Sequence, residues 1–105
     1  MEPLQVIAAP RRLQILELIW DRELPAGQIA AHFDVSFSAI SQHLHVLKAA
    51  GFLIERRAGN SRFYRADQAA LGPLRSVVKD HWRAGLDRLK HLAETEHATH
   101  KDTAP

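Results

Sequence analysis

The side chains between residues 36 and 65 are of the kinds that bind nucleic acid. Hydroxyl and amide groups can pair with base edges, and guanidinium groups can pair with phosphates. This segment holds five basic residues against one acidic residue, a net charge of +4, whereas residues 1–35 hold three basic and five acidic residues and residues 66–105 hold six of each. The sequence therefore predicts a positive surface for duplex DNA on a chain whose total net charge is only +2.

A helix over residues 37–50 is predicted to present the groups that read bases. Its preceding residue, Ser36, can accept a hydrogen bond from a free backbone N–H, and Gly51 can adopt the left-handed conformation that ends a helix. Ile40, Leu44 and Leu47 recur at spacings of three and four residues, which gives the helix one apolar face. That face is expected to pack on a preceding helix within residues 24–33.

The opposite face of the same helix stays free for a major groove. Gln42 is the best base reader on it, because its amide can pair bidentately with adenine. Together with the capping serine, the predicted contact residues of this helix are Ser36, Phe37, Ser38, Ser41, Gln42, His45 and Lys48.

A basic β-hairpin is predicted directly after the helix. Two segments typical of strands, residues 52–57 and 61–65, flank Ala58-Gly59-Asn60, which has the composition of a hairpin turn. Such a ribbon is narrow enough to follow a phosphate backbone or to enter a minor groove. It carries the remaining predicted DNA contacts, Arg56, Arg57, Arg62 and Arg65.

These elements predict a mainly α fold with a small β-hairpin, in the α+β class: a winged helix-turn-helix, expected to be dimeric. A single DNA-binding and dimerisation domain is expected over residues 1–95, followed by a disordered tail over residues 96–105. The chain has no cysteine, which excludes disulfides, and no apolar run of membrane-spanning length. A cytoplasmic location is the expectation, with no membrane partner.

Two motifs resemble the ArsR/SmtB family of winged-helix repressors. The first is Ser38-x-x-Ser41-x-His43-Leu44-x-x-Leu47-x-x-Ala50-Gly51-Phe52 followed by Gly59-x-x-x-x-Tyr64, and the second is Pro10-Arg11-Arg12-Leu13-x-Ile15-Leu16. The resemblance covers about residues 4–95. It implies a dimer that binds imperfect palindromes and leaves them when an inducer binds, with DNA-reading positions at Phe37, Ser38, Ser41 and Gln42.

An apolar stripe near the C-terminus predicts the dimer contact. It runs from Leu71 to Ala93 at spacings of three and four residues, and so small a domain cannot cover it all. In the family, a first helix packs with the last one across the two-fold axis, and the apolar segment before Pro10 matches that first helix. The predicted interface residues are Leu4, Ile7, Leu74, Val78, Trp82, Leu86 and Leu89.

Metal sensing is largely excluded by residue types. The family's thiolate site falls on Pro25 and Gly27, which cannot bind a soft metal. The family's zinc site along the last helix matches only in part, and whether Asp80, His81, His91 and Glu94 bind zinc stays open. His43 and His45 point too far apart on a helix to hold one ion, so His43 is expected to serve a contact between helices. No metal or cofactor is predicted.

The predicted function is therefore a sequence-specific transcriptional repressor that binds an inverted-repeat operator as a homodimer. The alternative is a zinc-responsive or small-molecule-responsive repressor with its ligand site on the C-terminal helix. An enzyme is not expected, because the sequence has no glycine-rich phosphate loop and no pairing of a nucleophile with a base. The operator, the regulated genes and the inducer, if there is one, are not encoded in these patterns.

Overall fold

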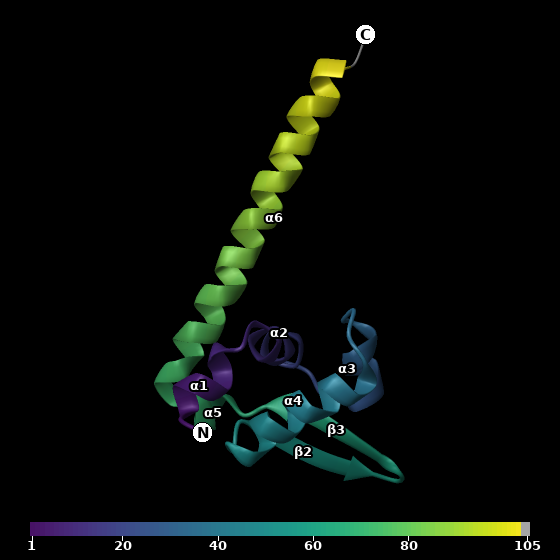
Figure 1. Ribbon diagram of the computed structural model, residues 1–105, viewed down its shortest axis with the longest axis vertical. Helices are drawn as coiled ribbons and strands as arrows, with labels where there is room; N and C mark the ends of the chain where they lie inside the picture. Colours follow the sequence, from purple (N-terminus) through teal and green to yellow (C-terminus); the bar gives the residue numbers. More distant parts are fainter. Residues whose placement is uncertain (104–105) are drawn as a thin grey trace.

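The computed structural model describes the backbone of residues 1–103 and the side chains of residues 1–95. Five short helices and a small sheet form a compact body, and the long last helix extends away from it (Figure 1). In chain order the elements are α1 (Pro3–Ala8), α2 (Pro10–Leu18), β1 (Leu24–Pro25), α3 (Ala26–Ala31), α4 (Phe37–Ala49), β2 (Leu53–Ala58), β3 (Ser61–Ala66), α5 (Gln68–Leu71), the 3-10 helix η1 (Gly72–Leu74) and α6 (Arg75–Thr103).

The core lies where α2, α3 and α4 meet. The predicted apolar face of α4 is confirmed, since Ile40, Leu44 and Leu47 are all buried. They share one cluster with Leu16 of α2 and Ile29 of α3. Burial of this stripe fixes the rotation of α4 about its axis, which leaves the polar face outward.

Both ends of α4 are formed as the sequence predicts. The Ser36 hydroxyl accepts a hydrogen bond from the Ala39 backbone N–H at 3.1 Å, which makes Ser36 the N-cap. Gly51 has a φ of 82°, the left-handed conformation that other residues rarely adopt. The chain then reverses, and the Phe52 N–H donates to the Leu47 carbonyl at 3.0 Å. The length of α4 is therefore fixed by local signals.

The predicted hairpin is present, but it belongs to a three-stranded antiparallel sheet in the order β1-β3-β2. Leu24 and Pro25 pair with Tyr64 and Phe63, so the helix expected from residue 24 begins only at Ala26. A two-residue strand has too little sequence to show alternation, and proline is tolerated there because β1 is an edge strand. This strand attaches the middle of β3 to the helical body.

Helix α6 packs on α2 through its first turns and then stands clear of the other elements (Figure 1). Within the described part of the chain, no helix is both long and apolar enough to span a membrane. The disordered tail predicted for residues 96–105 lies outside the residues whose side chains are described. It stays a prediction, although the backbone of residues 96–103 continues α6.

The predicted dimer residues differ in how far their own chain buries them. Ile7 and Val78 are 0% and 1% exposed, because α1 and the start of α6 close over the core of the same chain, so these two positions are corrected to core residues. Leu74 is half-buried against that core. The other predicted interface residues are exposed: Leu4, Trp82, Leu86 and Leu89. Leu92, which was not predicted for the interface, is exposed as well.

Candidate nucleic-acid interface

The outward face of α4 presents the predicted base-reading residues together. Ser38, Gln42, His45 and Lys48 are exposed and Ser41 is half-buried, as expected for a face that faces solvent along its whole length. Phe37 is 57% exposed at the first turn of the helix. The structure thus brings the helix residues of the predicted site onto one surface.

Arg12 of α2 holds α4 in place from behind. Its guanidinium donates to the backbone carbonyls of Val6 and Gln5, and its Nη1 lies 3.3 Å from Nδ1 of His43. Burial, together with the nearby charges of Arg12 and Arg11, holds the pKa of His43 below its ordinary value. A neutral His43 can accept from the arginine, so the prediction that His43 serves a contact between helices is confirmed.

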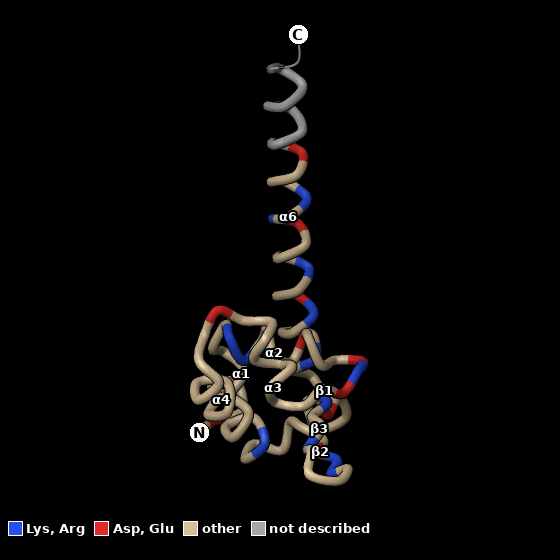
Figure 2. Tube along the Cα trace, turned by 90° about the vertical axis from the view of Figure 1, so that its right-hand side faces the viewer, with Lys and Arg blue, Asp and Glu red and all other residues tan. Residues whose placement is uncertain are grey.

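The hairpin β2–β3, called the wing from here on, presents only half of its arginines toward α4. Arg57 and Arg62 are cross-strand partners and share one face, which we call the inner face, with Glu55. This face lies beside α4, because Glu55 forms an ion pair with Lys48 of the last helical turn. Figure 2 shows Lys and Arg gathered at the wing, whereas basic and acidic residues alternate along α6.

The inner face is organised around the Glu55 carboxylate. Oε2 lies 2.5 Å from the Lys48 Nζ, and Oε1 lies 3.5 Å from Nη1 of Arg62. The hydrogen bond from Lys48 and the charges of Lys48, Arg62 and Arg57 hold the Glu55 pKa below its usual range. A hollow of about 250 Å³ lies among these four side chains, Lys48, Glu55, Arg57 and Arg62.

The other two arginines lie on the opposite, outer face of the wing. Arg56 binds Glu23, with its Nε 2.9 Å and 3.1 Å from the two carboxylate oxygens and its Nη2 2.5 Å from Oε1. The guanidinium also lies over the Phe63 ring, 4.7 Å from its centroid. Arg65 shares this face by register. The structure therefore divides the four predicted arginines into two pairs.

Glu23 is the residue of this region that sequence reasoning missed. It lies before β1 and is 33 residues from Arg56, so no local pattern connects them. The hydrogen bond from Arg56 lowers its pKa. Arg56 is thereby paired within the chain, and its contact with DNA stays a prediction.

A groove joins the recognition helix to the wing. It holds about 190 Å³ and is lined by small, polar and basic groups that come from α3, α4 and β3: Ala26, Ser41, Leu44, His45, Lys48, Arg62 and Tyr64. Hydrogen-bonding groups thus lie on the helix side and a guanidinium lies on the wing side. This combination can place base-reading groups in a major groove while cations contact the flanking phosphates.

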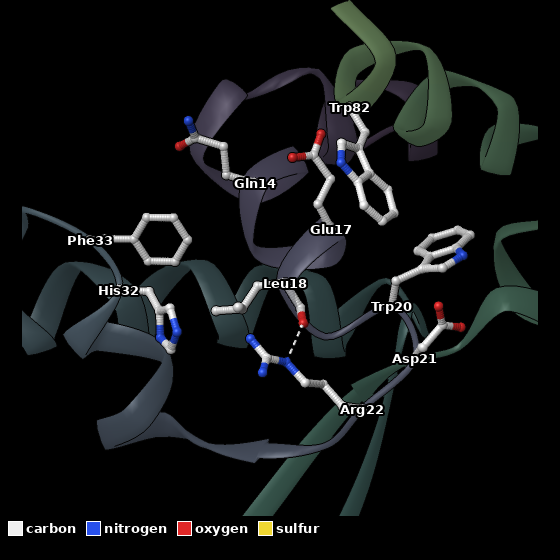
Figure 3. Close-up of a pocket in the computed structure, with 9 residues that line it drawn as sticks. All are labelled: Gln14, Glu17, Leu18, Trp20, Asp21, Arg22, His32, Phe33 and Trp82. Carbon is white, nitrogen blue, oxygen red and sulfur yellow. Dashed lines mark hydrogen bonds between the residues drawn. The ribbon is translucent and has the colours of Figure 1, made fainter. Parts of the chain in front are cut away.

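A larger hollow of about 680 Å³ lies on another part of the body, between α2, the segment that follows α2, the two residues that follow α3, and α6. Figure 3 shows the indoles of Trp20 and Trp82 near one another on one side, Phe33 and His32 on the other, and Leu18 between them. Both tryptophans of the chain line this hollow. No sequence pattern predicts this hollow, since its walls come from segments that are far apart along the chain.

The residues considered for zinc do not come together. His81 is engaged with Glu17 of α2, with its Nδ1 2.5 Å from Oε1, and Asp80 lies 3.6 Å from the Arg83 guanidinium. His91 and Glu94 are exposed farther along α6. Among the residues that the structure describes, no three potential metal ligands of the histidine, cysteine, aspartate or glutamate types are grouped closely enough to hold an ion.

Comparison with known proteins gives consistent matches. The family model described as bacterial regulatory protein, arsR family, matches residues 9–55. An HTH-type transcriptional regulator of Mycobacterium tuberculosis is 35% identical over 92 residues, which cover 88% of this chain and 86% of that protein. The transcriptional repressor SdpR of Bacillus subtilis is 36% identical over 67 residues, covering 64% of this chain and 74% of SdpR.

A solved structure also matches this chain. It is the homodimeric winged helix-turn-helix DNA-binding domain of a possible ArsR-family transcriptional regulator from Mycobacterium bovis. The TM-score is 0.65 at 30% sequence identity, and the match covers 73% of this chain and 71% of that one. This match supports a winged helix-turn-helix fold for the chain.

Proposed function

This chain belongs to the arsR family of bacterial regulatory proteins and is a DNA-binding transcriptional regulator rather than an enzyme, and from that premise we propose that it represses transcription as a homodimer bound to an inverted-repeat operator. The repressor role is supported by the similarity to SdpR. A repressor of this kind needs only to occupy its operator and exclude polymerase.

One observation carries the proposed mode of binding: the exposed face of α4 and the inner face of the wing form one continuous surface. In the proposed complex, the first turns of α4 enter the major groove, and Gln42 reads an adenine. Lys48, Arg57 and Arg62 contact the phosphates. The helix residues nearest the bases are Ser36, Phe37, Ser38, Ser41, Gln42 and His45.

The homodimer is supported by the exposed apolar stripe of α6. Trp82, Leu86 and Leu89 are exposed at spacings of three and four residues on a helix that stands clear of its own body (Figure 1). Exposed apolar stripes of this size mark contact surfaces. The similar domain from Mycobacterium bovis is homodimeric. Two copies joined through α6 would present two recognition helices to two half-sites of one operator.

Fluorescence anisotropy tests this function. Genomic fragments bound by the purified protein supply the operator, and a labelled operator duplex is then compared with a random duplex of equal length at several salt concentrations. We expect tighter binding to the operator by a factor of 10³ or more, roughly the lower end for specific regulators, and a loss of affinity when the half-site spacing is changed by about half a helical turn. Equal affinity for both duplexes would contradict the proposal.

A second function, response to a small molecule, is favoured by the aromatic hollow beside α6. Trp82 belongs to the helix proposed for dimerisation, and Trp20, Phe33 and Leu18 supply an apolar lining for a compact organic molecule. Because both tryptophans line the hollow, intrinsic fluorescence reports on its occupancy. A metabolite that binds there should change the fluorescence and release the operator duplex at the same concentration, whereas a fluorescence change without release would contradict an inducer role.

A further inference from the structure

Glu55 is the one acidic residue in the segment 36–65, and it lies among the cations proposed to hold phosphates. A carboxylate at this place repels the DNA backbone and should weaken binding. Its position is nevertheless built into the fold, because it sits on β2 opposite Tyr64 and its side chain is only 20% exposed. A role within the interface would explain why the fold holds a carboxylate at this place.

We propose that Glu55 is a specificity-determining residue, which holds Lys48 and Arg62 in one fixed arrangement and thereby suppresses binding to DNA of the wrong sequence. The inference rests on the proposed DNA-binding function and deepens it. Glu55 itself reads no base in this scheme, and it acts through the two cations.

The geometry supplies the first part of the argument. Lys48 belongs to the last turn of α4 and Arg62 belongs to β3, yet both are paired with one carboxylate, at 2.5 Å and 3.5 Å. Glu55 thus connects the recognition helix to the wing and restricts where the two positive groups lie. Its lowered pKa keeps the carboxylate ionised through the physiological pH range.

The second part concerns what random DNA needs. Nonspecific binding comes from cations that reach phosphates in many registers, so it depends on long, freely moving side chains. Cations held by Glu55 meet phosphates well only in the register that α4 adopts when its base contacts form. In other registers they must first leave the carboxylate, which offsets part of the gain from counterion release. The carboxylate therefore costs more affinity on random DNA than on the operator.

The decisive variant is Glu55→Gln, which keeps the shape of the side chain and removes its charge. We expect the affinity for a random duplex to rise about three- to tenfold, the size expected from releasing one or two surface ion pairs. On that duplex, the slope of log affinity against log salt concentration should become steeper by about one for each freed cation. Affinity for the operator should change less, so the ratio of operator to random affinity falls.

Glu23→Gln is the matched control. It removes the same charge from the acid that binds Arg56 on the outer face. The comparison therefore distinguishes an effect of where the charge lies from an effect of the net charge of the protein. We expect it to keep the wild-type ratio. Glu55→Asp retains the carboxylate and should restore most of the ratio that Glu55→Gln loses, a rescue that a purely steric role of the side chain would not produce.

Each remaining outcome is informative. Weaker binding of Glu55→Gln to both duplexes, or an equal rise with Glu55→Gln and Glu23→Gln, would overturn the role assigned to Glu55. Glu55→Ala removes the same carboxylate in a second way. Of Glu55→Gln and Glu55→Ala, the variant that unfolds cooperatively like the wild type on heating is the one used for the binding comparison. A wild-type protein that prefers no DNA sequence would instead refute the proposed function, independently of any Glu55 variant.

Discussion

Adjacent residues on α4 have opposite tasks. Gln42 is exposed on the face proposed for the major groove, whereas His43 is half-buried and contacts Arg12 of α2. Successive residues of a helix are about 100° apart, so one residue can face DNA while the next faces the body. The two positions therefore separate base reading from the placement of the helix.

Gln42→Ala should reduce affinity for the operator by about 1–3 kcal/mol, the discrimination expected of one bidentate contact with a base. Binding to a random duplex should hardly change, because nonspecific affinity comes from phosphate contacts. Anisotropy titrations with both duplexes measure the difference. Equal losses on the two duplexes would show that Gln42 does not read a base.

His43 predicts a pH-dependent stability. Its pKa is lowered from 6.5 in the folded state, so the unfolded chain binds the proton more readily. The contribution to stability is complete above pH 6.5, and it is lost as the pH falls below that value toward the folded pKa. The free energy of unfolding, measured with denaturant, should therefore be lower at about pH 5.5 than at about pH 7.5, and this difference should be smaller in His43→Asn.

His45→Asn is the control for this measurement. His45 lies two residues farther on the same helix and is exposed on the opposite side, so comparing His45→Asn with His43→Asn tests whether the effect belongs to the half-buried position. An unchanged pH dependence in His43→Asn would show that protonation of His43 is not linked to unfolding.

At the scale of elements, the wing functions as a ribbon with two different faces. Its inner face lies beside α4 and carries Arg57 and Arg62, and its outer face carries Arg56 bound to Glu23. Strand β1 pairs with the middle of β3, and at the base of the ribbon the Ala66 N–H donates to the Ile19 carbonyl at 2.9 Å. The wing is thus anchored at its base and free at its tip, near Gly59.

Arg57→Ala should weaken binding to the operator and to random DNA alike. It should also reduce the slope of log affinity against log salt concentration by about 0.9 per subunit, for one lost phosphate contact. Arg65→Ala removes the same charge from the outer face and should have a smaller effect on that slope. Anisotropy at four or more salt concentrations gives both slopes. Equal reductions would indicate that the two faces of the wing contact DNA, as in a minor groove.

At the scale of the molecule, the chain is a small body with a long helix whose apolar side chains from Trp82 to Leu92 lie exposed. The stripe on α6 is exposed from Trp82 onward, while the start of the same helix is buried at Val78. One helix thus closes the core of its own chain and offers a surface to another. This arrangement supports a dimer in which folding of the body and association of α6 are separable.

Leu86→Glu should therefore give a folded monomer. Leu86 is 52% exposed in the single chain, so a charge there is tolerated before association. The same charge costs several kcal/mol when it is buried without a partner in the proposed α6 dimer interface. Light scattering at micromolar concentration measures the mass, and operator binding should collapse because half-sites roughly 34 Å apart need two linked helices.

Ala84→Glu is the matched control for this prediction. Ala84 is exposed on the opposite side of α6, about 160° from Leu86 by helical geometry, so the same charge should leave the dimer intact. A Leu86→Glu protein that still dimerises and binds its operator normally would place the interface elsewhere.

The recognition helix, the hairpin and the family could be inferred from sequence because their signals are local. Ser36 and Gly51 mark the ends of α4, and the spacing of Ile40, Leu44 and Leu47 selects its buried face. These preferences act over a few residues, within one turn or one hairpin. The local chemistry therefore determined which side chains face solvent on α4.

Contacts between distant parts of the chain were decided only by the tertiary structure. Strand alternation separates Arg57 from Arg56, but only packing shows that the face of Arg57 lies beside α4. Glu23 and Arg56 are 33 residues apart, and no periodicity connects them. The burial of Ile7 and Val78 likewise depends on how α1 and α6 close over the core, because an apolar stripe does not specify which of its residues the same chain will cover.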